Sequence, residues 1–398
     1  MKFLGYPRPD QSVGVRNYVL VLPGGIIGSK ICEFVEGTKS IMLATDTFFD
    51  HTSRDRETVG RTLIGLGRNP NVASVIVDGS IDRAGYPEYL ADRLVEEISK
   101  SGKRVELLDP AKEGGTLAAI AKGIQLAREM VLEASESRRQ PFDLSRLVLA
   151  VKCGASDTTS GIAGNPVIGA LYDRVVGAGG TALLGENTEI VGAEHVLARR
   201  AVDEQVSKDI LRVAHDIEEE AKATGEDIRT MNPIPANIAG GISSLEEKSL
   251  GAICKSGTSP IQGVLRYGER PDGRGLYFVD TTPSMSIYLG YAASGAQLVL
   301  FQLGGGGLGR TDTDMLLIPS PGVITPLLWT TANPGTLSRS SSSIDFYSGT
   351  VLEGSDTIES SGEKLLQRIL DVASGSFTKT EAIKYEEPTQ VYLRDPIF

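Results

Sequence analysis

Cysteine and histidine are scarce in this sequence of 398 residues, which contains only three of each. Cys32, Cys153 and Cys254 lie far apart, and no two of them form a Cys-x-x-Cys pair. A closed zinc site or a disulfide framework therefore does not fit the sequence, and a reducing cytoplasm is the expected compartment.

An excess of basic residues is also lacking. The 40 Lys and Arg residues face 51 Asp and Glu residues, which gives a net charge of −11 and a pI near 5.0. Because nucleic acid binds to basic surfaces, it is not an expected partner. An anionic substrate would need its charge to be met locally, since the field of the whole chain repels it.

Long hydrophobic runs are absent. The first residues, MKFLGYPRPDQ, lack the apolar core of a signal peptide, and no apolar run approaches the roughly 18 residues that span a bilayer. We therefore expect a cytoplasmic protein that does not bind a membrane. An apolar content of 40% with a mean hydropathy of −0.06 is typical of a globular fold.

Short runs rich in Val, Ile and Leu alternate with stretches of helical periodicity. In the first third of the chain these runs lie at 17–23, 39–45, 73–79 and 103–109, and a long helix is expected over 116–137. This alternation predicts a parallel sheet covered by helices. The sequence RRQPFD at 138–143 is typical of a linker.

A second unit of the same kind begins with the apolar run RLVLAVKCG. Its further strands are expected at 179–186, 261–268, 275–280 and 296–304. We therefore predict an α/β fold of two parallel-sheet, Rossmann-like α/β domains with Gly-rich loops at the strand ends. The N-terminal domain would cover residues 1–140, and the C-terminal domain, with the main active-site motifs, residues 141–398.

The segment 151–200 concentrates reactive side chains in Gly-rich turns that follow apolar strands. Its thiol, carboxylates and imidazole belong to Cys153, Asp157, Glu186, Glu189, Glu194 and His195. Gly-rich turns let the backbone and polar side chains converge on a small ligand. We therefore place the active site in this segment.

Cys153 allows two interpretations. A thiol at this position could ligate a metal or act as a nucleophile, because its pKa falls at a helix N-terminus. A free cysteine is otherwise usually a small buried hydrophobic residue. The polar side chains at 156–160 favour a functional role.

Glu194 and His195 are adjacent at the start of an expected helix. A carboxylate beside an imidazole suits proton abstraction next to a carboxylate group, or ligation of a divalent metal. The alternative is an ordinary helix-terminal charge and a satisfied polar histidine.

The turn PGGIIGS at 23–29 resembles a phosphate-binding turn, but its glycines do not match Gly-x-Gly-x-x-Gly. A tight turn from strand to helix is the preferred interpretation. Lys255 is a candidate cation for a substrate carboxylate, although most lysines are simply solvated.

The order of several motifs resembles that of the altronate/galactarate dehydratase family, whose relatives include the large subunit of sulfolactate sulfo-lyase. The motifs are GYPRPDQSVGVRNYVLVLP at 5–23, KCGASDTTSGIAGNP at 152–166, GENTEIVGAEHVLARRA at 185–201 and NPIPANIAGG at 232–241. They extend over nearly the whole chain, and we identify it as a member of this family.

The resemblance implies a lyase that removes water from a hydroxylated sugar acid and gives a 2-keto-3-deoxy acid. In the sulfo-lyase branch, sulfite leaves a sulfonated hydroxy acid such as sulfolactate. Members are iron-dependent and carry a small N-terminal module, whose absence from this sequence predicts a separate small subunit. A homo-oligomer is the usual expectation for such enzymes.

The resemblance also suggests roles for individual residues. Glu194, His195, Asp157 and Glu186 are the candidate catalytic residues, with Glu194 or His195 as the base. Cys153 and His195 are the candidate iron ligands. The small anionic hydroxy acid would be bound by Arg16, Asn17, Ser156, Asn165 and Lys255.

Two departures from the family concern cysteine. Typical members carry one near position 50 and another just after the third strand, where this chain has TFFDHTSRD and VDGSIDRAG.

The resemblance and these departures leave three hypotheses for the function: a sugar-acid dehydratase, the large subunit of a sulfo-lyase, and a non-catalytic relative that binds a small acid.

Overall fold

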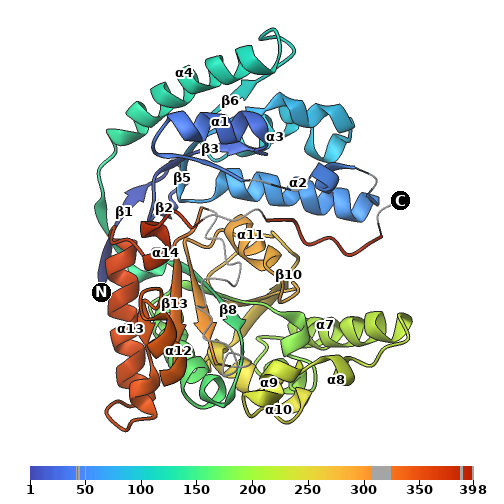
Figure 1. The fold of residues 1–398 in the computed structure, drawn as a ribbon, viewed down its shortest axis with the longest axis vertical. Helices are drawn as coiled ribbons and strands as arrows, with labels where there is room; N and C mark the ends of the chain where they lie inside the picture. Colours follow the sequence, from blue (N-terminus) through green and yellow to red (C-terminus); the bar gives the residue numbers. More distant parts are fainter. Residues whose placement is uncertain (42, 44, 50, 306–323, 386–388, 397–398) are drawn as a thin grey trace.

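The computed structural model describes residues 1–398 except 42, 44, 50, 306–323, 386–388 and 397–398. Two parallel sheets with helices on both faces lie one above the other in Figure 1, and a small antiparallel sheet lies beside them. The prediction of an α/β fold with parallel sheets is confirmed.

The N-terminal sheet has four parallel strands in the order β4-β3-β5-β6. The strands are β3 (Tyr18–Leu22), β4 (Thr38–Ser40), β5 (Val72–Asp78) and β6 (Arg104–Leu108). Residues Val19 and Val21 of β3 pack against α1 (Ile26–Phe34) and α4 (Thr116–Ser135), while Leu20 and Leu22 face the core that contains α2 (Ser53–Arg68) and α3 (Ala91–Ser99). This alternation is the two-residue period of a strand that is covered on both faces. The strand expected over 39–45 is shorter, because β4 ends at Ser40.

The C-terminal sheet has seven strands in the order β10-β11-β9-β8-β12-β13-β14, and every pair is parallel. The strands are β8 (Val148–Gly154), β9 (Thr181–Leu184), β10 (Ile261–Leu265), β11 (Gly275–Val279), β12 (Leu298–Leu303), β13 (Leu327–Thr331) and β14 (Phe346–Tyr347). The four strands expected here at the sequence level correspond to β9, β10, β11 and β12.

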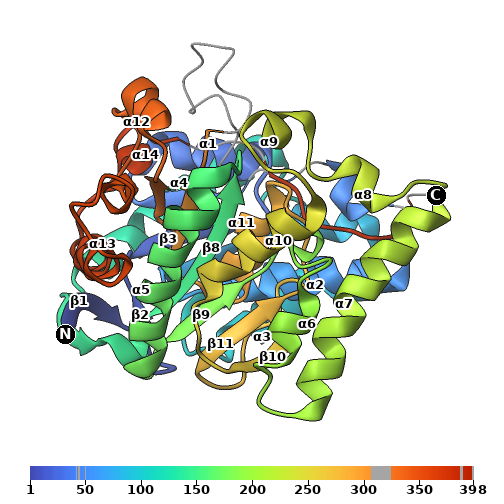
Figure 2. The same cartoon turned by 90° about the horizontal axis from the view of Figure 1, so that it is seen from below.

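Helices cover both faces of the C-terminal sheet. Figure 2 shows α5 (Asn165–Gly177), α7 (Glu204–Ala223), α10 (Leu245–Ile253) and α13 (Ile358–Ala373) on one face, where they share a core with Leu149 and Val151 of β8. The other face packs against α11 (Ser286–Ala293), which also contacts α2 and so lies between the two sheets.

The small antiparallel sheet corrects the sequence interpretation of residues 138–143. Residues predicted as a linker contain β7 (Gln140–Asp143), which pairs with β1 (Lys2–Pro7), and β1 also pairs with β2 (Val13–Gly14). The first strand of the chain thereby holds the segment that connects the two parallel sheets.

Buried polar side chains join the two units. Asn71 is fully buried, accepts a hydrogen bond from the amide of Val15, and donates to the carbonyl oxygens of Gln297 and Ile324. The end of the chain also returns to the N-terminal unit, where the Asp55 carboxylate accepts hydrogen bonds from the backbone amides of 394 and 395.

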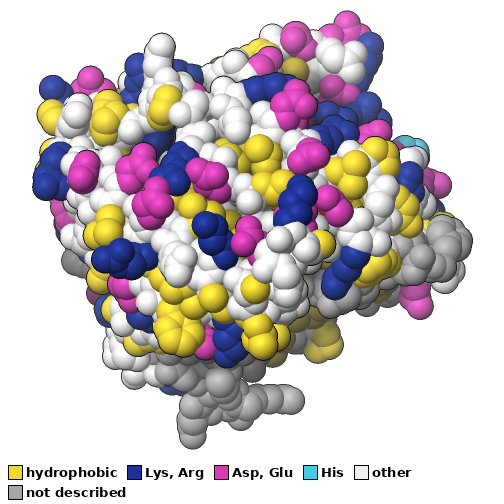
Figure 3. All heavy atoms as spheres, turned by 90° about the horizontal axis from the view of Figure 1, so that it is seen from above, with side chains coloured by type: hydrophobic (Ala, Val, Ile, Leu, Met, Phe, Trp, Pro, Cys, Tyr) yellow, Lys and Arg dark blue, Asp and Glu magenta, His cyan; other side chains and the backbone are white. Residues whose placement is uncertain are grey.

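The described surface mixes charges of both signs. Figure 3 shows Lys and Arg side chains interspersed with Asp and Glu over the face that carries the N-terminal helices. Among the described residues, no helix has the length and apolar character that crossing a membrane requires.

Candidate functional site

The carboxyl ends of β8 and β12 form the switch point of the C-terminal sheet. The chain runs from β8 to β9 on one side, and returns from β11 to β12 on the other side of β8. Open α/β sheets bind ligands in the crevice at this position, beyond the carboxyl ends of the strands. The turns Gly154–Asp157 and Gly304–Gly305 leave the sheet there.

Two residues at this edge have strained backbones. Ala155 follows β8 with φ of 48°, and Glu186 follows β9 with φ of 76°. Residues other than glycine rarely adopt positive φ, and such strain persists where the surroundings hold it and is concentrated at functional sites. The strained turns therefore support the placement of the site at this edge.

A cluster of buried charges lies beside these turns. Glu186 Oε2 accepts hydrogen bonds from the Cys153 amide at 3.0 Å and from Lys255 Nζ at 2.6 Å. Lys255 Nζ also donates to Glu189 Oε2 at 2.7 Å. Glu186 and Lys255 are at most 1% exposed, and Glu189 is 4% exposed. One ammonium group is therefore held between two carboxylates in the interior.

Two further lysines surround this cluster. Lys152 Nζ lies 3.7 Å from Glu186 Oε1 and donates to the Cys153 carbonyl at 2.6 Å. Lys248 Nζ lies 3.9 Å from Glu189 Oε1. With these two, three ammonium groups face two carboxylates, so the cluster has a local positive excess in a chain of net charge −11.

The two glutamates have opposite pKa shifts. Burial raises the pKa of Glu186, the neighbouring charge of Glu189 raises it further, and Lys255 and Lys152 only partly offset this. Burial would also raise the pKa of Glu189, but Lys255 and Lys248 together lower it to about 2. Carboxylates with pKa values pushed apart are typical of acid and base roles, and Glu186 is the one suited to exchange a proton.

Glu186 also has an acceptor that the described part of the chain leaves unused. Its Oε1 is buried and forms no hydrogen bond with any described residue. Buried acceptors without a partner are rare in native structures, and such an atom can serve a ligand.

Asp157 organises the edge from the opposite side. Its Oδ1 accepts hydrogen bonds from Ser160 and Thr159, and its Oδ2 accepts from the Gly305 amide and from Asn333 Nδ2, both at 2.7 Å. One carboxylate thus joins the turns that follow β8, β12 and β13.

A cavity of about 310 Å³ opens beside Asp157. Ser156, Asn165 and Lys248 contribute to its lining. Ser156 is hydrogen-bonded to Cys153, and Lys248 lies next to Glu189, so the charged cluster stands directly behind the cavity wall. Asn165 is 2% exposed, and its Oδ1 forms no hydrogen bond with described residues, so it can accept one from a ligand hydroxyl.

A second cavity, of about 290 Å³, lies at the carboxyl edge of the N-terminal sheet. Gly24 and Gly25 line it together with Asp78, whose pKa is raised by burial. A Cβ on Gly24 would lie 2.1 Å from the Ile41 carbonyl oxygen, so the turn PGGIIGS is a tight connection between β3 and α1, as the sequence favours. Phe48 and Ser80, from the two turns that lack the family's cysteines, also line this cavity.

Comparison with known sequences identifies the chain. Residues 144–394 match the family described as D-galactarate/altronate dehydratase, C-terminal, and residues 5–135 match D-galactarate dehydratase/altronate hydrolase, second domain. The chain belongs to the D-galactarate/altronate dehydratase family. The resemblance stated from the motifs is confirmed.

Curated relatives of this family member are lyases. It is 35% identical over 393 residues to the (2R)-sulfolactate sulfo-lyase subunit beta of Chromohalobacter salexigens, an alignment that covers 97% of this chain and 96% of that protein. It is 30% identical over 400 residues to altronate dehydratase of Bacillus subtilis, with 97% and 76% covered. It is 32% identical over 320 residues to galactarate dehydratase (L-threo-forming) of Escherichia coli, with 79% and 59% covered. The chain is accordingly an enzyme of the lyase class.

The structure brings together only part of the residue set predicted for this dehydratase-family member. Cys153, Ser156, Asp157, Asn165, Glu186 and Lys255 lie at the carboxyl edge of the C-terminal sheet or directly behind it. Lys255 is enclosed by glutamates, which occupy the position where a substrate carboxylate was expected.

Glu194 and His195 lie elsewhere. They open the short helix α6 (Glu194–Ala198), neither lines the cavity beside Asp157, and the His195 side chain is exposed. Glu194 Oε2 is buried and forms no hydrogen bond with any described residue, and the catalytic roles of Glu194 and His195 stay predictions.

Arg16 and Asn17 bind protein groups away from the cavity. Arg16 pairs with both carboxylate oxygens of Glu381 at 2.8 Å. Asn17 accepts a hydrogen bond from Arg8 and donates one to the carbonyl of Ala134. Both side chains hold segments of the fold together.

Iron does not fit the described residues. Among them, no group of three or more His, Cys, Asp and Glu side chains has the arrangement of a metal site. Burial, with the nearby Glu189, raises the pKa of Cys153 to about 12. Glu186 and Glu189 already bind an ammonium group. The iron dependence implied by the family remains a prediction.

Four site residues were missed or left without a role at the sequence level: Lys152, Glu189, Lys248 and Asn333. A lysine inside the apolar run VLAVKCG was a usable signal, because a strand buried on both faces does not take a charge without a partner. Asn333 could not be recognised from its neighbours in the sequence. It contacts Asp157 because β8 and β13 lie in the same sheet and end at the same edge.

Proposed function

We propose that this lyase removes water from a hydroxylated sugar acid, with Glu186 as the base that receives the proton next to the carboxylate. The observation that carries the proposal is the buried Glu186 side chain, with its raised pKa and its unused Oε1, directly behind a polar cavity. A base whose pKa is shifted toward the working pH is the most effective proton acceptor.

The proposed reaction is an elimination followed by tautomerisation. The C2–H bond breaks, its electron pair forms a C2=C3 double bond, and the C3–O bond breaks. The leaving hydroxide takes its electron pair and a proton, and departs as water. The resulting enol takes up a proton at C3 and loses the proton of its C2 hydroxyl group, which gives a 2-keto-3-deoxy acid.

The chain's own residues supply the binding and the charge stabilisation. Lys248, in the cavity wall, binds the substrate carboxylate, and Asn165 Oδ1 accepts a hydrogen bond from a hydroxyl group. In this proposal the proton passes to Glu186 through one bridging water. Lys152 and Lys255 stabilise the negative charge that develops in the transition state.

A second candidate is elimination of sulfite from a sulfonated hydroxy acid. The alignment with the sulfo-lyase subunit covers 97% of this chain and 96% of that protein, whereas the altronate dehydratase alignment covers 76% of its relative. The proton abstraction would be the same. Sulfite leaves as an anion without protonation, so this branch does not require an acid for the leaving group.

A partner subunit belongs to the same proposal. The sulfo-lyase relative is named a subunit beta, which supports a complex of this chain with a separate small subunit. A homo-oligomer is proposed as well, since most soluble enzymes form one. Size-exclusion chromatography with light scattering tests the homo-oligomer, and co-purification with a candidate small subunit tests the complex.

The test is a panel of sugar acids and sulfonated hydroxy acids, with 2-keto acid and sulfite measured separately. We expect a 2-keto acid without sulfite for the first candidate and both products for the second. Glu186→Gln should reduce kcat by about 10²–10⁴-fold. Glu219→Gln, which alters an exposed side chain paired with Lys222 on α7, is the control.

The cavity at the carboxyl edge of the N-terminal sheet is the alternative location for the reaction. If Asp78→Asn abolishes activity while Glu186→Gln leaves it intact, the chemistry takes place at the edge of the N-terminal sheet and the proposal is wrong. If no acid gives a product under any of these conditions, the binding-only hypothesis becomes the one to pursue.

A further inference from the structure

A cavity of about 170 Å³ opens at the amino edge of the C-terminal sheet, opposite the carboxyl edge that carries the candidate site. Its walls are the first residues of β8 and β9, the turns that precede β11 and β12, and the turn between β1 and β2. The charged residues of the lining are Arg146, Arg270 and Arg274, after which we name it the arginine cavity. No Asp or Glu belongs to this described lining.

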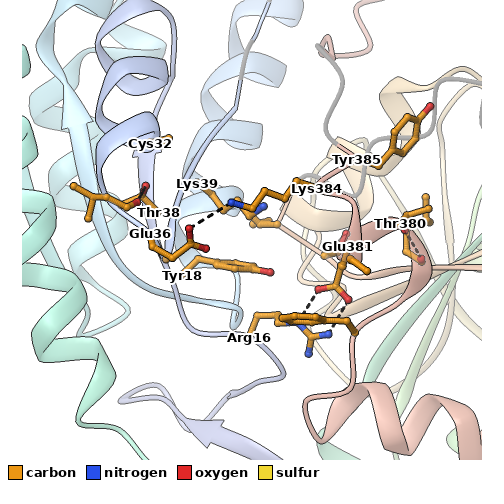
Figure 4. Close-up of a pocket in the computed structure, with 17 residues that line it drawn as sticks. Arg16, Tyr18, Cys32, Glu36, Thr38, Lys39, Thr380, Glu381, Lys384 and Tyr385 are labelled. Carbon is orange, nitrogen blue, oxygen red and sulfur yellow. Dashed lines mark hydrogen bonds and ion pairs between the residues drawn. The ribbon is translucent and has the colours of Figure 1, made fainter.

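Two cations of the cavity between the units, in contrast, have carboxylate partners. That cavity has a volume of about 340 Å³, and Figure 4 shows Arg16 beside Glu381 and Lys384 beside Glu36. Both cations form ion pairs with these glutamates. Because the chain has 51 acidic and 40 basic residues, a cluster of arginines without such partners is unexpected.

None of the three guanidinium groups of the arginine cavity forms an ion pair with a described residue. Their hydrogen bonds go to backbone carbonyl oxygens, from Arg146 to Gln11 at 3.3 Å, from Arg270 to Arg68 at 3.5 Å and from Arg274 to Gly179 at 3.5 Å. These distances are long for hydrogen bonds, and each guanidinium has five N–H donors. Most of these donors therefore remain available to a ligand.

The nearest carboxylates are engaged elsewhere and do not line the cavity. Asp10 Oδ1 accepts hydrogen bonds from the amide and the hydroxyl of Ser12 at 3.0 and 2.6 Å, and Asp272 accepts one from the Tyr277 hydroxyl at 3.2 Å. Burial lowers the pKa of Arg270, and the charge of Asp10 opposes this effect. A bound anion would compensate for the desolvation of Arg270 and for the repulsion among the three cations.

Neutral hydroxyl groups complete the lining, and one of them is buried without a partner. Ser294 is 1% exposed, and its Oγ forms no hydrogen bond with any described residue, which is rare for a buried polar atom. The adjacent Gly295 has φ of 96°, and a Cβ on it would lie 3.4 Å from Arg270 Nε. The unused hydroxyl and the Arg270 guanidinium therefore lie at the same turn.

We propose that the arginine cavity binds a phosphate group, either as free phosphate or as part of a small phosphomonoester. Guanidinium groups match phosphate oxygens with paired N–H donors. A phosphate dianion offers more acceptor oxygens than a carboxylate, so it can bind three guanidinium groups and a hydroxyl at once. The cavity and the proposed catalytic site lie at opposite edges of the sheet, so the phosphate site is separate from the reaction.

The test is calorimetric titration of the full chain with inorganic phosphate and with glycerol 3-phosphate, at constant ionic strength. We expect saturable binding of one phosphate group per chain and a rise in Tm. Arg146→Met and Arg274→Met should each weaken binding by about tenfold, the loss expected for one charged contact. Both side chains are exposed, so these variants should fold normally. Arg212→Met, in an exposed pair with Asp209 on α7, is the matched control.

Two further variants separate recognition of phosphate from a folding defect. Arg274→Lys keeps the charge and should retain more affinity than Arg274→Met, and Ser294→Ala should weaken binding with all three arginines in place. Tighter binding of one of the two probes identifies free phosphate or a phosphomonoester as the preferred form.

The proposal is overturned if the unaltered chain binds neither probe saturably, or if both arginine-to-methionine variants bind as tightly as the unaltered chain. Glu186→Gln should bind phosphate normally, because Glu186 lies at the opposite edge of the sheet. The outcome is therefore independent of the proposed catalytic function.

Discussion

Asn333 Nδ2 donates to Asp157 Oδ2 across 2.7 Å, although the two residues are 176 positions apart in the chain. The contact joins the turns after β13 and β8, and the Gly305 amide adds the turn after β12 on the same oxygen. Three strand ends are therefore positioned by a single buried carboxylate.

Asp157→Asn should lower the free energy of unfolding by about 2–3 kcal/mol. The Asp157 carboxylate accepts hydrogen bonds on both oxygens, whereas the amide of asparagine would place an N–H group opposite one set of these donors. Urea unfolding measures the change. Asp143→Asn, at an exposed site without a side-chain capping bond, should stay within about 0.5 kcal/mol of the original. Equal stability of the two variants would show that Asp157 does not hold the turns.

Lys255→Met should lower the free energy of unfolding by about 3–5 kcal/mol, which is more than Asp157→Asn. The variant leaves Glu186 and Glu189 buried without the cation that they share. Adding Glu189→Gln to this variant should recover part of the loss, since one buried charge is then removed. A double-mutant cycle by denaturant unfolding measures the coupling. Additive effects would contradict the direct contact.

The acid sensitivity of the fold should depend on Glu189. Its folded pKa of about 2 is below its usual value of 4.5, so its contribution to the free energy of unfolding is fully present above about 4.5. That contribution is lost as the pH falls toward 2. Glu189→Gln should flatten the dependence of stability on pH in this window. A variant with the unaltered slope would exclude Glu189 as its source.

The rate should fall at acid pH as Glu186 becomes protonated, because the proposed base must be ionised. Burial raises the pKa of Glu186, and Lys152 counteracts part of this effect. Lys152→Met should therefore move the acidic limb of the kcat/KM profile to higher pH. Lys208→Met, in an exposed pair with Glu204, should leave the profile unchanged. A limb that stays in place in the first variant would exclude Glu186 as the titrating group.

Iron content should be insensitive to Cys153. Its thiol is hydrogen-bonded to Ser156, and among the described residues it belongs to no group of three or more side chains arranged as metal ligands. Elemental analysis of anaerobically purified Cys153→Ser should therefore give the same iron per chain as the unaltered protein. A selective loss of iron from the variant would restore the sequence prediction that Cys153 is a ligand.

The fold was predictable because its signals are local. Alternation of apolar strands with periodic helices depends on neighbours in sequence, and it located both parallel sheets. The strand β7 was mistaken for a linker because its partner β1 lies more than 130 residues upstream, beyond the reach of any local pattern.

The site was predictable only as a region. Gly-rich turns marked the carboxyl edge, yet the enclosure of Lys255 depends on glutamates 66 and 69 positions away. Glu194 and His195 follow the same expected strand as Glu186. A turn separates them from that strand, and His195 is exposed on α6. The order of the residues indicates at which edge of a sheet a residue lies. The packing of the whole fold determines which other side chains it contacts.

The return of the chain end to Asp55 has a consequence for synthesis of the protein. Backbone amides at 394 and 395 satisfy a carboxylate that leaves the ribosome more than 300 residues earlier. Until those amides arrive, the Asp55 carboxylate that is buried in the final fold must be hydrated or paired elsewhere. The N-terminal unit is therefore completed only after residues 394 and 395 have been translated.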